Sequence, residues 1–238
     1  KLVISVFSRI DKSIAQGYSE LYEGNYINDI SDKIQEFIKN KGWSITIKSI
    51  LENNEHSNKL EACRKIIVNS ILENIRDSLG KLGIVFDDWF SESMLFEGNL
   101  VDKTIARLKE TGKTIKKDGA LMFNDDEPRV LIKSNGEYTY FASDLAYHDK
   151  KMREFDRVIN IWGADHHGYV NRVCKGLESL GHDIDKLDIH LIQFANLYRG
   201  KEKVSMSTRK GEFVELDTLL QEIGIDAINY FYLMRSKD

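Results

Sequence analysis

The 238-residue sequence has few cysteines, one proline and no long apolar run. The two cysteines, Cys63 and Cys174, are too few for a disulfide framework and lack the spacing of metal ligands, which favours a reducing, cytoplasmic compartment. No apolar stretch approaches the roughly 20 residues of a membrane-spanning helix, and the N-terminal residues do not resemble a signal peptide. We therefore expect no membrane partner.

Charge and composition are those of an ordinary globular protein. A net charge of −4 excludes a surface covered with basic groups but allows a local basic patch for nucleic acid. With 42% hydrophobic residues the chain can bury a sizeable core. The only proline is Pro128, and the chain begins with Lys1 in what reads as the middle of a structural element, so we expect a fragment of a longer protein.

The first part of the chain has helical periodicity. Apolar residues recur every three or four positions over residues 58–82, which predicts a helix with one apolar face that ends near Gly80 and Gly83. A second helix is predicted from about Asn99 to Gly112.

The middle of the chain changes to a strand pattern. Residues 114–123 read as two short strands around Asp118-Gly119, a strong hairpin signal. Residues 129–142 repeat the pattern around Asn135-Gly136, so two consecutive hairpins are predicted.

The last third reads as α/β. Residues 158–162 form a continuous apolar run, typical of a strand buried on both faces. A helix over 167–180 and a second strand over 189–193 complete a βαβ unit, which predicts a parallel sheet. A polar loop and two helices, near 216–223 and 226–235, follow.

A first candidate site, residues 163–168, comes directly after the first predicted strand of this sheet. Ligands of open parallel sheets bind beyond the carboxyl ends of the strands. Gly163 allows close approach to the backbone, Asp165 can accept hydrogen bonds from hydroxyls or bind a cation, and His166 and His167 begin a helix that favours an anion. The histidine pair lacks a third ligand at metal spacing, so no metal site is predicted. A capped strand-to-helix turn without a ligand is the alternative.

Two further clusters carry candidate chemistry. Residues 200–213 combine glycines, hydroxyls and basic side chains, which suits a loop that closes on phosphates, although a solvated charged loop gives the same pattern. Around Asp144 stand Tyr138, Tyr140 and Tyr147, and a carboxylate among aromatic rings suits a cationic ligand. By pattern alone, a helix cap with core aromatics explains this third cluster better.

Several segments together resemble class I arginyl-tRNA synthetases. They are TYFASDLAYH (139–148), FDRVINIWGADHHGYVNRV (155–173), LIQFANL (191–197), SMSTRKGEFVELDTLL (205–220) and IGIDAINYFYLMRS (223–236), in matching order and spacing. The resemblance covers essentially the whole chain. It implies that residues 1–113 are a mainly helical connecting part of the catalytic domain. Residues 114–238 would be the hairpins and the second half of a Rossmann-like, parallel-sheet nucleotide-binding fold.

The resemblance also implies roles for individual residues. The segment Ser205, Met206, Ser207, Thr208 and Arg209 stands where the family carries the catalytic KMSKS loop, which grips the phosphates of ATP. Arginine recognition falls to Tyr140, Asp144 and Asp165. The implied ATP-binding residues are Gly163, Asp165, His166, His167, Gln193, Phe194 and Ala195.

The implied reaction is ligation of arginine to tRNA(Arg) through arginyl-adenylate, with ATP and its accompanying Mg²⁺. The sequence departs from the family's motifs in two ways that argue against this activity. Ser205 and Thr208 replace both lysines of the KMSKS pattern, and the sequence contains no HIGH motif. Lys203, Arg209 and Lys210 could supply the missing charge. We expect this chain by itself to be a catalytically inactive monomer. The alternatives are a degenerate, non-catalytic module that binds tRNA or protein, and another class I synthetase or nucleotidyl transferase.

Overall fold

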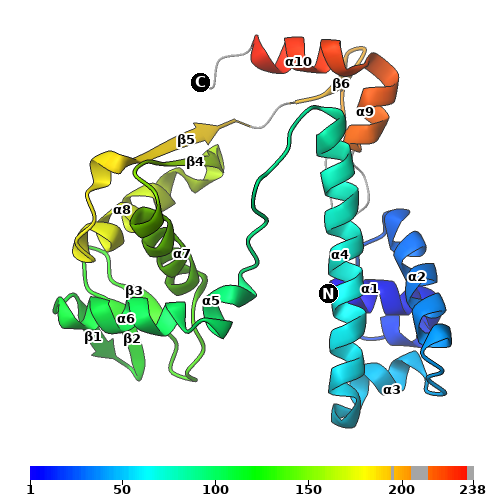
Figure 1. The fold of residues 1–238 in the computed structure, drawn as a ribbon, viewed down its shortest axis with the longest axis horizontal. Helices are drawn as coiled ribbons and strands as arrows, with labels where there is room; N and C mark the ends of the chain where they lie inside the picture. The colour runs from blue at the N-terminus through cyan, green and yellow to red at the C-terminus, as the bar shows by residue number, and fades with distance from the viewer. Residues whose placement is uncertain (194–195, 205–213, 235–238) are drawn as a thin grey trace. The chain divides into compact units, whose positions relative to one another are not determined.

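The computed structural model describes residues 1–193, 196–204 and 214–234 (Figure 1). The described residues divide by their contacts into two compact units, residues 1–86 with 196–204 and 214–234, and residues 87–193. The boundary predicted at residue 113 divides the chain by type of element instead, and it stays a prediction. No helix in the described ranges combines the length and the apolar character needed to cross a membrane.

The first unit is mainly helical. It contains α1 (Leu2–Ile10), α2 (Tyr26–Asn40), α3 (Ile47–Glu52) and α4 (Ser57–Lys81), the last of which confirms the helix predicted over 58–82. Isoleucines of α2, α3 and α4 meet α1 in one core, which also buries Cys63. Burial raises the pKa of the Cys63 thiol to about 11, so this cysteine is a packing residue rather than a reactive one.

The C-terminal helices of the chain belong to the same unit. The short strands β6 (Tyr198–Arg199) and β7 (Glu202–Lys203) pair as an antiparallel ladder, and α9 (Leu216–Ile223) and α10 (Ile225–Leu233) confirm the two predicted helices. Asp217 in the first turn of α9 accepts hydrogen bonds from Ser78 and Lys81 of α4 at 2.9 and 2.7 Å. These bonds tie α9 to the end of α4.

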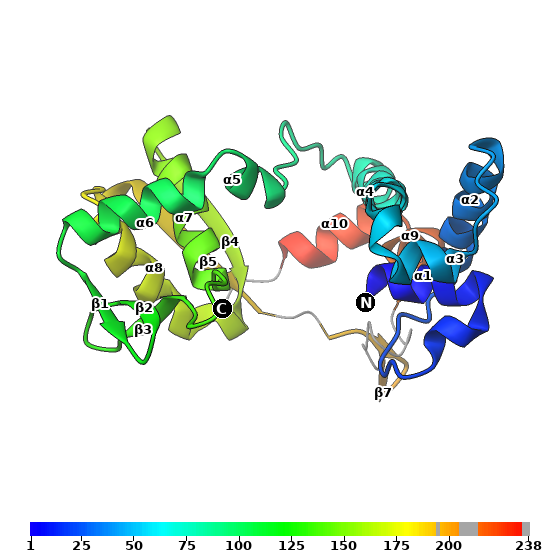
Figure 2. The same ribbon diagram turned by 90° about the horizontal axis from the view of Figure 1, so that it is seen from below.

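The second unit holds a three-stranded antiparallel sheet and a two-stranded parallel sheet (Figures 1 and 2). Its elements are α5 (Ser93–Glu97), α6 (Leu100–Glu110), β1 (Thr114–Lys117), β2 (Ala120–Phe123), β3 (Arg129–Ile132), α7 (Tyr140–Glu154), β4 (Val158–Gly163), α8 (His167–Ser179) and β5 (Leu187–Ile192). The helix predicted from Asn99 is confirmed as α6.

The first predicted hairpin is confirmed. Of the second, the turn around Asn135 and Gly136 is confirmed, but the strand predicted after it is wrong. β1 and β2 pair around Asp118 and Gly119, whose φ angles of 50° and 77° suit a turn that needs positive φ. After β3 the chain turns back on it: Ile132 and Tyr138 form a bridge, and the Thr139 N–H donates to the Leu131 carbonyl at 3.0 Å. On its other side β3 pairs with β2. Thr139 ends the return because its hydroxyl caps α7, accepting a hydrogen bond from the Ala142 N–H, so Tyr140 begins a helix.

The parallel βαβ unit is confirmed, but its first strand is buried on one face only. β4 and β5 pair in parallel from Val158–Leu187 to Gly163–Ile192. Val158 and Asn160 are buried, whereas Ile159 and Ile161 are 58% and 73% exposed. Successive residues of a strand face opposite sides, and α7 and α8 pack in one core with the buried side of this sheet. The prediction failed because a short apolar run does not reveal which of its faces is covered.

Helices α7 and α8 approach each other closely at Gly176. A β-carbon at this position would lie 2.8 Å from Cδ1 of the fully buried Leu145, so the absence of a side chain allows the close approach. The two helices thereby bring their N-terminal turns within hydrogen-bonding reach of each other.

Asp149 of α7 is the charged centre of the second unit. Its fully buried carboxylate accepts hydrogen bonds from Arg107 of α6 at 2.7 and 2.9 Å and from Arg153 at 2.8 Å. Nε2 of His182 lies 2.6 Å from Oδ1, and the Thr104 hydroxyl donates at 3.0 Å. Arg107 also donates to the carbonyl of Leu180, at the C-terminal end of α8. One carboxylate therefore joins α6, α7 and the end of α8.

Replacing Asp149 with asparagine should destabilise the protein. Removing one partner of a buried ion pair costs about 3–5 kcal/mol, and the partial exposure of both arginines lowers the expected loss to roughly 2–4 kcal/mol of unfolding free energy. Urea unfolding measures this loss. Asp156→Asn, at an exposed position of the same unit, is the matched control and should change stability by less than about 0.5 kcal/mol.

The Asp149→Asn variant should also lose part of the pH dependence of the protein's stability in acid. Burial raises the pKa of the Asp149 carboxyl, but its hydrogen bonds and charges from His182, Arg107 and Arg153 outweigh burial and hold the pKa below its usual value. A lowered pKa stabilises the fold above the unfolded pKa of about 4, and this contribution is lost as the pH falls further. The unfolding free energies of wild type and Asp149→Asn would then fall with different slopes below pH 4. Equal slopes would contradict this role of Asp149.

Replacing Gly119 with alanine should destabilise the hairpin. Its φ of 77° strains any side chain, and the added β-carbon would lie 3.3 Å from Cβ of Ser134, so a loss of about 1–2 kcal/mol is expected in thermal or urea unfolding. Gly80→Ala is the control with the opposite sign. Gly80 lies in α4 with open space around it, so alanine should stabilise that helix by up to roughly 1 kcal/mol.

Candidate functional site

The carboxyl ends of β4 and β5 form a polar edge. The register pairs Gly163 with Ile192, so Gln193 and the short 3-10 turn Ala164–His166 follow their strands at this same edge. A β-carbon at Gly163 would lie 2.5 Å from Oδ1 of Asp165, so a side chain there would displace the carboxylate. Asp165 and His166 are both more than half exposed, with 3.9 Å between Oδ2 and Nε2. His167 is the first residue of α8, whose backbone N–H groups favour an anion.

The first turn of α7 carries a second group of polar atoms. Tyr140 and Asp144 are four residues apart on this helix, so they lie on the same face, and Tyr140 is 85% exposed. The hydroxyl of Tyr169, in the first turn of α8, donates to Oδ2 of Asp144 at 2.8 Å. Burial, and then the hydrogen bond and charge of Asp144, raise the pKa of Tyr169, so the phenol stays protonated and remains a donor.

Aromatic rings join these two groups. The ring centroid of Tyr169 lies 6.3 Å from Phe141, 5.8 Å from Trp162 and 6.4 Å from His166. Trp162, at the end of β4, lies 6.3 Å from His166. The structure therefore brings the segment 163–168 next to Asp144, although the sequence pattern places them in two separate clusters.

Two tyrosines of the predicted aromatic cluster pack elsewhere. The hydroxyl of Tyr138 donates to Asp102 of α6, and its ring lies against Phe96. Tyr147 stacks on Phe90 with 4.6 Å between centroids. For these two residues the packing alternative describes the structure.

A buried polar chain lies beneath Asp144. The Lys151 ammonium donates to Oδ1 of Asn160 at 2.8 Å, so the Asn160 amide nitrogen faces Nε2 of His148 at 2.7 Å. Because Nε2 then accepts, Nδ1 of His148 carries the proton and donates to the carbonyl of Asp144 at 2.7 Å. Burial, and then the nearby Lys151, lower the pKa of His148 to about 4, so the imidazole is neutral at physiological pH.

The charge of Asp144 has no ion-pair partner among the described residues. Tyr169, a neutral donor, is the one side chain of that part of the chain that bonds to this carboxylate, and Lys151 bonds to Asn160 instead. A half-buried carboxylate in this state favours a cationic ligand, because an added cation gains a partner without displacing one.

The remaining predicted site residues lie outside the described ranges. They are Phe194, Ala195, Ser205, Met206, Ser207, Thr208 and Arg209. In the ranges that are described, no three His, Cys, Asp or Glu side chains are grouped as a metal site would require.

The sequence patterns did not indicate roles for Tyr169, Trp162, His148 or Asn160. The three-residue spacing of His166 and Tyr169, which puts them on one helical turn, was a usable signal for Tyr169. No local pattern indicated the bond between His148 and Asn160, because these two residues belong to different elements, α7 and β4.

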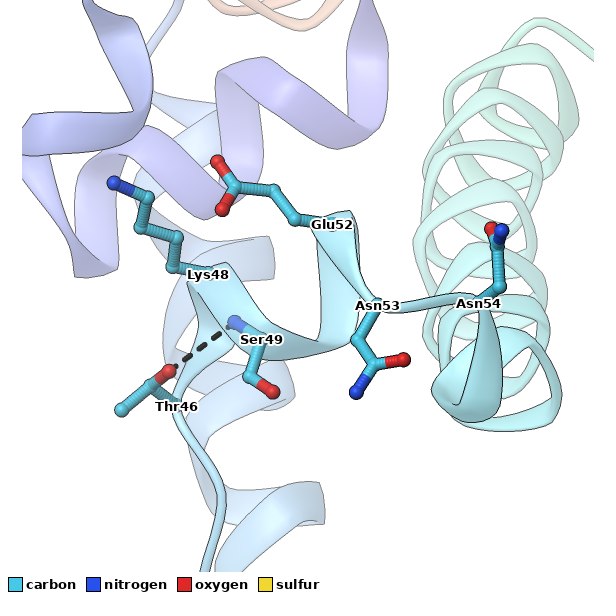
Figure 3. A pocket seen from close by; sticks show the side chains of 6 residues that line it. All are labelled: Thr46, Lys48, Ser49, Glu52, Asn53 and Asn54. Atoms are coloured by element: carbon cyan, nitrogen blue, oxygen red, sulfur yellow. Dashed lines mark hydrogen bonds between the residues drawn. The ribbon is translucent and has the colours of Figure 1, made fainter.

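A separate hollow lies around the start of α3 in the first unit (Figure 3). It is lined by polar side chains, of which Thr46 caps α3 by accepting a hydrogen bond from the Ser49 N–H at 3.1 Å. This accounts for Thr46 structurally, and we assign no ligand to the hollow.

Known proteins with a similar sequence belong to one family. The family described as tRNA synthetases class I (R), catalytic domain, matches residues 16–230. An arginine–tRNA ligase of Oceanobacillus iheyensis is 39% identical over the whole chain, which spans 43% of that protein. Another, from Thioalkalivibrio sulfidiphilus, is 52% identical over 71% of the chain and is covered over 30% of its own length.

Solved structures agree with this assignment. A crystal structure from Campylobacter jejuni, assigned as an arginyl-tRNA synthetase, superimposes on the whole chain with a TM-score of 0.78 and 30% identity, over 52% of its length. The Thermus thermophilus arginyl-tRNA synthetase has a TM-score of 0.59 at 16% identity and supports the fold alone. The α/β fold class with a parallel sheet is thus confirmed. The chain spans about half or less of these relatives, and it belongs to the class I arginyl-tRNA synthetase catalytic-domain family.

Proposed function

We propose that the protein carrying this chain ligates arginine to tRNA(Arg) with ATP, through arginyl-adenylate. The observation that carries the proposal is the half-buried Asp144 carboxylate, which has a neutral hydroxyl as its donor and lies beside the polar edge at Gly163. Family membership supplies the reaction, and this carboxylate supplies a reason for the choice of amino acid.

Asp144 suits a guanidinium better than an ammonium. A planar guanidinium offers two parallel N–H groups to the two oxygens of a carboxylate, whereas an ammonium is a point charge. The exposed ring of Tyr140, on the same face of α7, can contact the cation through its π-face. Asp165 would bind the other end of the amino acid or the ribose of the nucleotide.

The nucleotide would lie along the polar edge of the parallel sheet. Gly163, Asp165, His166 and His167 would face its sugar and phosphates, and Gln193, Phe194 and Ala195 would border the adenine. The segment Ser205, Met206, Ser207, Thr208 and Arg209 would contact the phosphates. Mg²⁺ bound to those phosphates would neutralise part of their charge, and no side chain is assigned to it.

The chemistry then needs positioning more than a reactive side chain. The arginine carboxylate attacks the α-phosphorus of ATP, the bond to the β-phosphate oxygen breaks, and pyrophosphate leaves. A terminal ribose hydroxyl of tRNA next attacks the arginyl carbonyl, and AMP leaves. Holding the reactants together and stabilising the developing phosphate charge lower both barriers.

Two other functions are kept as alternatives. Ser205 and Thr208 at the lysine positions of the phosphate-gripping loop favour a degenerate module that binds tRNA or protein without catalysis. Another class I synthetase or nucleotidyl transferase would use the same sheet with a different amino acid.

The test of the reaction is ATP–pyrophosphate exchange by the full-length gene product, with tRNA present. Exchange should depend on arginine and should not occur with lysine, because lysine lacks the planar fork that Asp144 recognises. Exchange with another amino acid would favour the second alternative. Complete absence of exchange, together with tRNA binding, would favour the non-catalytic module.

The test of the arginine site is Asp144→Ala. Removing the charge partner of the guanidinium should weaken arginine binding by roughly 2–4 kcal/mol, or about 30- to 1,000-fold in Kd by calorimetry. Asp156→Asn serves as control and should keep wild-type affinity. Unchanged arginine affinity in a folded Asp144→Ala protein would reject the assignment.

A further inference from the structure

The structure assigns Tyr169 as a positioning residue that orients the Asp144 carboxylate before the guanidinium binds. This inference rests on the proposed function, since it concerns the same site. The Tyr169 hydroxyl donates to Oδ2 of Asp144 at 2.8 Å, and no other side chain in the described residues donates to this carboxylate. Without Tyr169 the carboxylate would be free to rotate about its side-chain bonds.

The ring of Tyr169 is held from three sides. Phe141 meets it edge-on at 80°, His166 meets it at 69°, and Trp162 lies 5.8 Å away. These contacts come from α7, from the turn before α8 and from β4, so a shift of the ring would disturb three elements. The hydroxyl is therefore a fixed donor, and its raised pKa keeps the proton on it at neutral pH.

The backbone of Asp144 is fixed independently. His148 donates to its carbonyl, and Asn160 of β4 holds the other nitrogen of that imidazole. The edge-on contact between His148 and Trp162, with centroids 5.8 Å apart, joins this chain to the aromatic rings around Tyr169. With its backbone and one oxygen held, Asp144 loses little conformational freedom when a ligand binds, and less lost freedom means tighter binding.

One oxygen remains available for the ligand. Tyr169 bonds Oδ2, and no donor to Oδ1 exists among the described residues. Each carboxylate oxygen accepts more than one hydrogen bond, so a guanidinium can bond both oxygens while Tyr169 stays in place. The tyrosine thus orients the acceptor without competing for it.

Tyr169→Phe in the full-length gene product tests the inference. The ring and its packing remain, and only the hydroxyl is lost. Arginine Kd should rise about 5- to 30-fold, since one hydrogen bond to a charged group is removed, while the KM for ATP should change less than twofold. Tyr138→Phe is the matched control, because it also removes a hydroxyl that donates to a carboxylate, that of Asp102. It should leave arginine Kd unchanged.

A double-mutant cycle separates positioning from a general structural role. If Tyr169 acts through Asp144, the double variant Tyr169→Phe/Asp144→Asn should bind arginine no more than twofold weaker than Asp144→Asn alone. Additive losses, or equal losses for arginine and ATP, would overturn the inference. So would wild-type arginine affinity in Tyr169→Phe when Asp144→Asn is impaired, an outcome that leaves the proposed function intact. Unimpaired binding by Asp144→Asn would instead reject the arginine site itself.

Discussion

The second unit depends on the buried carboxylate of Asp149. Three helical segments meet there because Arg107 of α6, Arg153 of α7 and His182 beyond α8 all bond to one group. Burying a carboxylate away from water costs free energy unless nearby groups compensate its charge. Loss of any one of these partners would therefore leave part of that cost uncompensated. The bonds fix α7 against α6 and α8, and this arrangement lets the first turns of α7 and α8 meet at Asp144 and Tyr169.

Asp144 and Asp149 lie five residues apart on the same helix and have opposite electrostatic environments. Two arginines and a histidine surround Asp149, which therefore holds the fold together and has no capacity left for a ligand. Asp144 has a single neutral donor among the described residues, and Lys151 bonds to Asn160 rather than to this carboxylate. The difference in compensation, rather than the residue type, separates a structural carboxylate from one suited to a cationic ligand.

Local patterns predicted most of the elements correctly. The helix periodicity of 58–82, the turn residues Asp118-Gly119 and the strand–helix–strand order after Val158 each correspond to observed structure. The errors arose where a competing interaction acts. Thr139 caps a helix where the last strand of the second hairpin was predicted, and Ile159 and Ile161 are exposed where burial on both faces was predicted. The motif positions placed Gly163, Asp165 and Asp144 among the candidates, but Tyr169 was not among them.

The sequence by itself determined the types of the elements, their order and the family, because periodicity, turn chemistry and motif spacing are properties of neighbouring residues. Only the tertiary structure decided which charges are compensated. The bonds of Tyr169 to Asp144 and of Arg107 to Asp149 span 25 and 42 residues, and the proton on Nδ1 of His148 follows from a lysine that reaches it through Asn160 on β4. Such pairings depend on the packing of α6, α7, α8 and β4, which no local pattern encodes.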